Sequence, residues 1–417
     1  MRVSSVLALL VAASSLRADE GMWTFDNIPS AQIKAKYGVT LEAGWLKKLQ
    51  LATVRFPGGT GAFVSVDGLV VTNHHVGRSA IAQVSSAKAD LVRDGFTAFT
   101  REQEIKVPGL ELMMLVASEN VTAKVNAAVT PGMADKDALT ARRNALANLR
   151  KAEEAKTGLT CEPVTLYQGG EYWLYSYRKF TDVRLAAAPE LQVAAFGGDP
   201  DNYTYPRHNL DFSLFRVYEN GKPYRPDAFL PFSAQGVSMG ELTFISGHPG
   251  TTYRQQTHAQ MAYARDIGIP FQLKTMARQR AALVALSATS AENRRLAADA
   301  IYGIDNGAKR LSGQLLGLVK PENLKKVADA EASLQKAVAQ DSAQKDRVGG
   351  SWARVEQAVS RQQALLKEQT FMAPGRVTSL SHALTLVRMA DEAAKPSDKR
   401  LTEFSDGNLK ATTTALL

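Results

Sequence analysis

The sequence predicts a β-rich region followed by a helical region, arranged as two domains. From about residue 45 to residue 260, short apolar runs rich in β-branched and aromatic residues alternate with Gly, Pro, Asn-Gly and Asp-Gly, a pattern typical of strands joined by turns. After about residue 265, Ala, Leu, Gln, Lys and Arg dominate, and apolar residues recur at helical intervals. A chain of 417 residues with 45% hydrophobic content is long enough to bury two cores.

Two hairpins are predicted within the β-rich region. The first joins residues 62–66 to residues 69–73 through Asp67-Gly68, and the second turns at Asn220-Gly221. Both dipeptides favour tight turns, because Gly, Asn and Asp accept a positive φ angle. The stretch 132–156 is rich in charged residues and interrupts the strands. It predicts an exposed helix between β segments.

The helical region carries its apolar residues in stripes. One set is Trp352, Val355, Val359 and Leu366, which a helix brings to one face. Such a stripe is typical of a face that packs on a core rather than of a cofactor site.

The first residues resemble a secretory signal peptide. A basic start at Arg2 is followed by an apolar run over residues 6–13 and a small-residue ending near Ala18. We expect cleavage near Ala18 and export to the periplasm or the medium. The run is too short to span a bilayer, and no later stretch approaches about 18 consecutive apolar residues. We therefore expect a soluble mature protein with no membrane partner.

The composition argues against several function classes. The formal net charge is +9, yet no nucleic-acid-binding motif accompanies it, so we interpret the excess as a basic solvated surface. The single cysteine, Cys161, excludes an intramolecular disulfide and is more typical of a small buried hydrophobe than of a nucleophile. No HExxH motif or Cys/His cluster is present, and we expect neither a metal nor a cofactor.

The clearest chemical signal is a histidine pair after the first hairpin. Residues 72–76 read Thr-Asn-His-His-Val. A histidine that emerges from the second strand of a hairpin is well placed to act as a general base, because a rigid strand end fixes its imidazole. We assign that role to His75. His74 points the opposite way if the chain is extended there, and we expect it to be structural.

A candidate partner for this base is Asp211, which opens the apolar strand that leads to the second hairpin. A buried carboxylate there can accept the Nδ1 proton of a histidine and fix its tautomer. Asp199 and Asp201 lie among turn residues, where capping and turn roles explain them better.

Four ordered blocks of sequence resemble one family, the S46 dipeptidyl-peptidases. They are GGTGAFVSVDGLVVTNHH (58–75), LYQGGEYWLYSYRKFTDVRLAAAPE (166–190), FGGDPDNYTYPRHNLDFSLFRVYENGKP (196–223) and SGHPGTTYR (246–254). The resemblance implies a chymotrypsin-like double β-barrel with an α-helical domain inserted in the second barrel. It also implies release of dipeptides from the free N-termini of peptides, and homodimers. We expect a signal peptide at 1–18, the catalytic β-barrel region at 19–265 with its second barrel incomplete, and a truncated α-helical cap domain at 266–417.

The resemblance also assigns roles to individual residues. His75 matches the catalytic base and Asp211 the acid that orients it. Asn202 and Tyr203 match the pair that binds the free α-amino group of the substrate, with Tyr203 in place of the commoner tryptophan. Asn306 resembles a further asparagine that contacts the same amine. Oxygen acceptors suit this task, because a buried ammonium group must recover its lost hydration through hydrogen bonds.

One part of the family pattern is absent from the sequence. The nucleophilic serine of the family lies in a Gly-Asn-Ser-Gly-Ser-Pro-like block, and no such block occurs among these residues. Ser213, Ser246 and Ser312 are better explained by structural roles. We therefore expect that the serine-bearing segment is missing, which leaves open a dipeptidyl-peptidase fragment, an inactive peptide-binding pseudoenzyme and a truncated gene product. The final residues, 411–417, lack a capping signal or a closing strand, which favours truncation.

Overall fold

The structure is a computed structural model that describes residues 21–250, 253, 255–372, 378–397, 400–404, 409, 412 and 413. The predicted signal peptide lies outside the described residues. The chain forms two compact units. Unit 1 comprises the described residues of Met1–Ala117 together with Ser176–Glu190 and Asp211–Pro249, and unit 2 comprises those of Ser118–Tyr175, Leu191–Leu210 and Gly250–Leu417.

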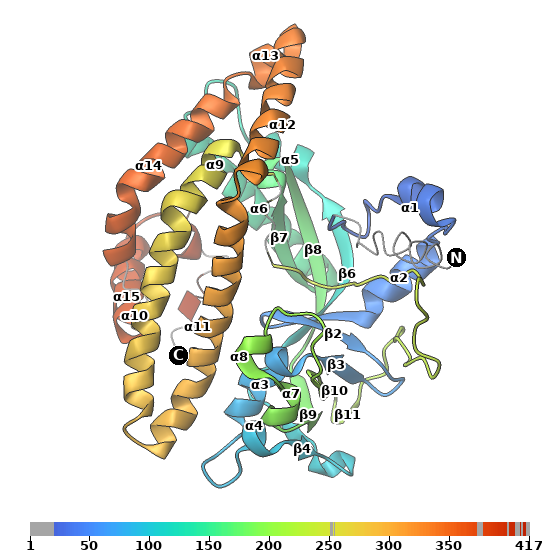
Figure 1. Cartoon of the computed structure of the whole chain (residues 1–417). Helices are drawn as coiled ribbons and strands as arrows, with labels where there is room; N and C mark the ends of the chain where they lie inside the picture. Colours follow the sequence, from blue (N-terminus) through green and yellow to red (C-terminus); the bar gives the residue numbers. More distant parts are fainter. Residues whose placement is uncertain are drawn as a thin grey trace, which may run out of the picture. The chain divides into compact units, whose positions relative to one another are not determined.

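The strands form an antiparallel sheet with the order β4-β9-β10-β3-β2-β1-β6-β8-β7 (Figure 1). Strand β11 pairs with β10, and β5 pairs with β9. The bounds are β1 Thr53–Phe56, β2 Gly59–Phe63, β3 Leu69–Thr72, β4 Phe96–Thr97, β5 Ile105–Lys106, β6 Leu112–Asn120, β7 Thr160–Leu166, β8 Glu171–Phe180, β9 Asp182–Ala188, β10 Ser213–Glu219 and β11 Lys222–Pro223. The predicted combination of a β region and helices is thus confirmed, and the double barrel stays a prediction.

Helices make up most of unit 2 and a smaller part of unit 1. In unit 1 they are α1 Ser30–Tyr37, α2 Ala43–Ala52, α3 His74–Gln83 and α4 Leu91–Asp94. In unit 2 they are α5 Thr122–Asn126, α6 Asp135–Thr157, α7 Leu191–Ala194, α8 Gly198–Asp201, α9 His258–Tyr263, α10 Ile269–Ser287, α11 Ala291–Leu318, α12 Pro321–Gln340, α13 Ser342–Val348, α14 Ser351–Phe371 and α15 Thr378–Ala393. A π-helical turn, 264–268, joins α9 to α10.

Both predicted hairpins are present. Strands β2 and β3 pair antiparallel around Asp67-Gly68, where Gly68 has a φ angle of 76°. A Cβ atom at Gly68 would lie 2.7 Å from the carbonyl oxygen of Tyr224, so this turn requires glycine both for its φ angle and for space. In the second hairpin, Asn220 (φ 51°) and Gly221 (φ 75°) join β10 to β11, as a two-residue turn with two positive φ angles demands.

The core of unit 1 lies beneath these hairpins. Phe63 and Phe215 are fully buried, and the ring of Phe215 packs at 5.4 Å, centroid to centroid, from that of Phe56. Aliphatic residues from the neighbouring strands complete the cluster, among them Val54, Val70, Leu112, Val183, Leu185 and Val217. This core supports β3 and β10, the two strands that lead to the candidate active site.

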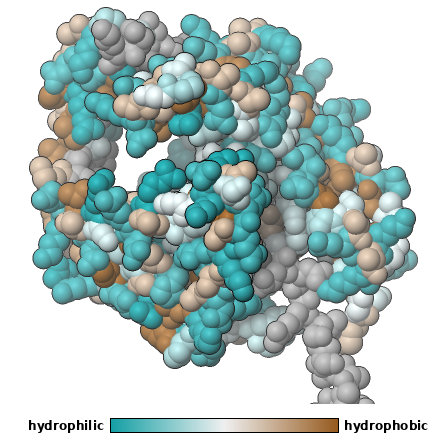
Figure 2. All heavy atoms as spheres, turned by 90° about the horizontal axis from the view of Figure 1, so that it is seen from above, coloured by the Kyte–Doolittle hydropathy of each residue, from teal (hydrophilic) through white to brown (hydrophobic). Residues whose placement is uncertain are grey.

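The predicted helices occur where the sequence placed them. Helix α6 covers most of the charged stretch 132–156, and Ala138 is its one buried residue. Helix α14 carries the stripe of Trp352, Val355, Val359 and Leu366, all half-buried among mostly exposed neighbours. In the view of Figure 2, hydrophilic residues cover most of the visible surface, with hydrophobic residues scattered among them. Among the described residues, no helix combines the length and apolarity that crossing a membrane would need.

Candidate active site

The pairing of β3 with β10 brings two distant chain segments together in unit 1. Thr72, the last residue of β3, lies opposite Ser213, the first residue of β10. The chain leaves β3 directly into helix α3, which begins at His74. Asp211 precedes β10 by two residues. His75 and Asp211 are therefore neighbours although 136 positions separate them in the sequence.

The two predicted catalytic side chains are in contact. The Nδ1 atom of His75 lies 2.6 Å from Oδ2 of Asp211, and the backbone N–H of His75 donates to Oδ1 of the same carboxylate at 3.0 Å. The side chain of Asp211 is 23% exposed and that of His75 is 49% exposed. This geometry holds the imidazole by one nitrogen and leaves Nε2 as the ring nitrogen available to a reacting group.

A third residue, Asn73, contacts the same oxygen of the carboxylate as the ring of His75. Its Nδ2 group donates to the backbone oxygen of Asp211 at 3.1 Å and to Oδ2 at 3.3 Å. Asn73 occupies the N-cap position of α3, yet its side chain makes no capping hydrogen bond. The side-chain amide of Asn73 therefore binds Asp211 instead of capping α3. The sequence reasoning missed this residue, although its position directly before the histidine pair was a usable signal.

These contacts keep Asp211 ionised. Burial of the carboxyl group raises its pKa, but the hydrogen bonds from the ring and the backbone of His75 outweigh that effect, and the net pKa of Asp211 is lowered. A carboxylate that stays charged can stabilise an imidazolium as it forms.

His74 is buried, as a structural residue would be, but the expected reason was wrong. We predicted an extended chain that turns its side chain opposite to that of His75, whereas both histidines lie in the first turn of α3. The residue is 2% exposed. Burial is the main cause that lowers the pKa of His74, and the electrostatic effects of Arg78 and His75 act in the same direction, against that of Asp211. The neutral imidazole is the form that this site accommodates.

The three serines considered in the sequence and the single cysteine have structural surroundings. Ser213 is fully buried and its Oγ donates to the backbone oxygen of Asn73 at 3.2 Å. The Oγ of Ser246 lies 2.8 Å from Oγ1 of Thr53. Ser312 lies in helix α11. Cys161 is buried in an apolar cluster with Val121, Val125 and Leu174. Burial of this kind is what the sequence predicted for the cysteine.

Two of the three residues predicted to bind an amine, Asn202 and Asn306, are in contact in unit 2. Asn202 follows the short helix α8, and Asn306 lies in the middle of α11, which runs beside α8 (Figure 1). The Nδ2 group of Asn202 donates to Oδ1 of Asn306 at 3.0 Å. Tyr203 has a φ angle of 61° and is 59% exposed. The three side chains thus come from two segments about 100 positions apart, with the tyrosine ring open to solvent.

Two basic residues that the sequence reasoning missed surround this asparagine pair. Arg207 donates to the Oδ1 atom of Asn202 at 3.4 Å and to the backbone oxygen of Gly198 at 3.1 Å. Lys309, one turn beyond Asn306 on α11, donates to the backbone oxygen of Asp199 and, at 3.0 Å, to that of Pro200. No periodic or motif signal marks either residue.

The loop that carries α8 is closely packed on itself. Gly197 has a φ angle of 78°, and a Cβ atom there would coincide with the carboxylate of Asp201. Asp199 and Asp201 both belong to α8. The N–H of Asp201 donates to the backbone oxygen of Gly197 and the N–H of Asn202 to that of Asp199, so both aspartates lie in a turn.

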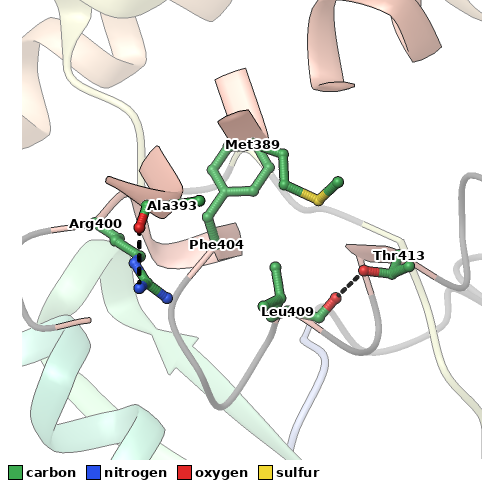
Figure 3. A pocket seen from close by; sticks show the side chains of 6 residues that line it. All are labelled: Met389, Ala393, Arg400, Phe404, Leu409 and Thr413. Carbon is green, nitrogen blue, oxygen red and sulfur yellow. Dashed lines mark hydrogen bonds between the residues drawn. The ribbon is translucent and has the colours of Figure 1, made fainter. Parts of the chain in front are cut away.

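The other candidate sites contain fewer groups that could take part in catalysis or bind a ligand. No group of three or more potential metal ligands occurs within the described part of the chain. One pocket of unit 2 has a mainly apolar lining made by Met389, Ala393, Arg400, Phe404, Leu409 and Thr413 (Figure 3). In the close-up, the guanidinium of Arg400 is turned to the backbone of Ala393 and the hydroxyl of Thr413 to that of Leu409. None of the predicted site residues lines this pocket.

Comparison with known proteins gives consistent matches. The sequence model of the family Peptidase S46 matches residues 18–417. Dipeptidyl-peptidase 7 of Phocaeicola vulgatus is 34% identical over 283 residues, which are 61% of this chain and 39% of the relative. The Asp/Glu-specific dipeptidyl-peptidase of Shewanella putrefaciens is 31% identical over 338 residues, which are 76% of this chain and 45% of the relative.

A solved structure agrees with these sequence matches. The crystal structure of Porphyromonas endodontalis DPP11 in complex with the dipeptide Arg-Glu is similar to this chain with a TM-score of 0.74 and 26% identity, over 96% of this chain and 59% of that one. The chain therefore spans less than half the length of the curated relatives described above and about three fifths of this structure.

Proposed function

This chain belongs to the peptidase S46 family, and on this premise we propose that it supplies the catalytic base and the amine-binding groups of a serine-type dipeptidyl-peptidase. The enzyme releases dipeptides from peptides that have a free N-terminus. The names of the relatives, which are dipeptidyl-peptidases, support this reaction. The observation that carries the proposal is the contact of 2.6 Å between His75 and Asp211.

In the proposed mechanism His75 moves protons and Asp211 orients it. A serine Oγ attacks the carbonyl carbon of the second peptide bond, and its proton passes to Nε2 of His75. Asp211 holds the proton on Nδ1 and stabilises the imidazolium. His75 then gives its new proton to the departing amine, and the acyl-enzyme is hydrolysed by water through the same steps. The serine comes from a segment outside these 417 residues.

The substrate amine binds at Asn202, Tyr203 and Asn306. An ammonium group donates three hydrogen bonds, and amide oxygens accept them without the need for a second charge. The contact of 3.0 Å between Asn202 and Asn306 supports a shared role. The half-exposed ring of Tyr203 adds an aromatic face for the cation.

The proposal also covers the architecture of the catalytic region and the cellular location of the protein. Residues 226–249 of unit 1 form neither helix nor strand and expose large hydrophobic side chains, among them Phe232, Met239 and Ile245. We propose that this segment joins the serine-bearing segment in the second of two chymotrypsin-like barrels. This barrel belongs to a catalytic region, 19–265, which a helical region, 266–417, follows in the sequence.

We also propose that the chain is cleaved near Ala18, exported to the periplasm or the medium, and assembled as a homodimer.

The test is steady-state hydrolysis by the protein expressed from its whole gene. Dipeptidyl-aminomethylcoumarins with a free amine should be cleaved, whereas their N-acetylated forms and single-residue substrates should not. His75→Ala and Asp211→Asn should each lower kcat by at least about 10³-fold, as loss of a triad member does in serine peptidases.

His258→Ala is the matched control, because His258 is an exposed histidine at the start of α9 and should leave kcat unchanged. Cleavage that survives His75→Ala would contradict the assignment of the base. Free-amine peptides that bind without any cleavage would instead favour the peptide-binding pseudoenzyme.

A further inference from the structure

The short helix α8 ends in carbonyl groups that its own four residues cannot satisfy. The backbone oxygen of Asp199 accepts from the N–H of Asn202 at 3.0 Å and also from the ammonium group of Lys309. The same ammonium group donates to the backbone oxygen of Pro200 at 3.0 Å. Lys309 therefore caps the carboxyl end of α8 from a different helix, where a positive charge is favourable.

Arg207 closes the same loop from its other end. One guanidinium nitrogen donates to the backbone oxygen of Gly198, in the first turn of α8, and another lies 3.4 Å from Oδ1 of Asn202. The residue is half-buried. The loop is thus held at its start by Arg207 and at the end of α8 by Lys309, and Asn202 follows α8 directly.

Two contacts consequently hold the amide of Asn202, the hydrogen bond to Asn306 and the contact with Arg207, and Lys309 holds the backbone just before it. Asn306 and Lys309 lie three residues apart, so they project from the same side of α11. Helix α11 has 28 residues and provides a rigid support for the four-residue helix α8. The amide position then depends on α11 rather than on the loop alone.

From these contacts we infer that Lys309 and Arg207 are positioning residues for the amine-binding amide of Asn202. The inference rests on the proposed function, because it assigns a purpose to the asparagine pair. Neither basic side chain contacts the reacting atoms in this role. Their loss lets the α8 loop relax and weakens the hold on the substrate ammonium group, while the chemical step is unaffected.

The experiment compares Lys309→Met, Lys309→Arg and Arg207→Gln in the protein expressed from its whole gene. The substrate is the free-amine dipeptidyl-aminomethylcoumarin that the wild type cleaves best. Lys309→Met and Arg207→Gln should raise KM about tenfold with kcat within about twofold, as loss of one charge-assisted hydrogen bond implies. Lys309→Arg keeps the charge and should restore KM to within about threefold. Lys325→Met removes an exposed lysine of α12 and should leave both constants unchanged.

A thermal unfolding curve for each variant separates positioning from folding. A variant that is merely less stable loses active enzyme, so its apparent kcat falls with KM unchanged, and this result would overturn the inference. The inference alone also fails if the wild type prefers free amines over N-acetylated substrates and Lys309→Met leaves KM unaltered. If the wild type shows no such preference, the proposed amine site itself fails, and the inference fails with it.

Discussion

The carboxylate of Asp211 binds His75 twice, through the ring Nδ1 at 2.6 Å and through the backbone N–H at 3.0 Å. The first contact sets the tautomer of the ring, and the second ties the carboxylate to the first turn of α3. The start of α3 therefore holds both the imidazole ring and the carboxylate that orients it. A movement of the helix start carries both groups together, which keeps the hydrogen bond short.

Asn73→Ala should lower kcat about tenfold while the protein remains folded. The side chain holds Asp211 through two donor contacts and does not cap α3. Its loss therefore weakens the orientation of the acid without the usual cost of a lost helix cap. Steady-state kinetics and thermal unfolding of the same preparation check this. Asn323→Ala, at the start of α12, is the control. A large fall in Tm with kcat unchanged would contradict the assignment.

Acid should destabilise unit 1 through His74. Its pKa in the folded state lies below its ordinary value of 6.5, so the unfolded chain takes up the proton first as the pH falls. The stabilisation is complete above pH 6.5 and is lost as the pH falls through the folded-state pKa. The pKa of Asp211 is also lowered from 3.8, so its contribution is lost only at more acidic pH.

Chemical denaturation at pH 7, 6 and 5 tests this expectation. His74→Gln does not titrate and should show a smaller fall in the free energy of unfolding than the wild type. His258→Gln, which alters an exposed histidine, should show the same slope as the wild type. Equal slopes for the wild type and His74→Gln would exclude His74 as the titrating group.

Gly77→Ala should destabilise the protein by about 1–3 kcal/mol, the usual cost of overpacking a core. The added Cβ atom would lie 2.5 Å from Oγ of Ser213 and 2.9 Å from the ring of Phe215, so α3 would have to move away from β10. Gly303→Ala in α11 is the matched control, because no atom lies within 4 Å of its Cβ position. It should stabilise the helix by about 0.5–1 kcal/mol. Urea unfolding measures both, and a neutral Gly77→Ala would argue against this packing.

Glu104→Gln should cost about 3 kcal/mol of folding free energy. Its carboxylate accepts from Arg216 at 2.9 Å and from the hydroxyl of Tyr218 at 2.8 Å, and the side chains of Arg216 and Glu104 are only 12% and 4% exposed. Removing one partner leaves a buried guanidinium with less compensation. Glu119→Gln, which breaks an exposed pair with Lys124, should cost less than about 1 kcal/mol. Similar values for the two variants would contradict the role of burial.

Local features of the fold were predictable from the sequence. The turns at Asp67-Gly68 and Asn220-Gly221 depend on the φ angles of their own residues, and the stripe on α14 depends on helical spacing. The start of α3 was not predicted, because the strand pattern continues through Thr72 without a break. The helix begins two residues later, at His74.

The composition of the site was only partly predictable. His75, Asp211, Asn202, Tyr203 and Asn306 were assigned from motifs and family resemblance, and the structure brings them into two groups. The contacts of Lys309 depend on tertiary packing between segments about 110 positions apart, and those of Arg207 depend on how the α8 loop folds back on itself. From the sequence alone, a lysine within a helix is expected to be a solvated side chain. Its contact with α8 can be recognised only in the folded structure.

The register between β3 and β10 also determines where insertions and deletions in the sequence can be tolerated. The residues between Asn73 and Asp211 form most of the sheet and several helices of unit 2, but the alignment of Thr72 with Ser213 sets the separation of the histidine from its acid. Insertions and deletions in the intervening surface loops leave that alignment intact. A single-residue slip of β10 against β3 would break it. We therefore expect changes of length in those loops to preserve the contact of His75 with Asp211, and a one-residue insertion between Asp211 and Ser213 to disrupt it.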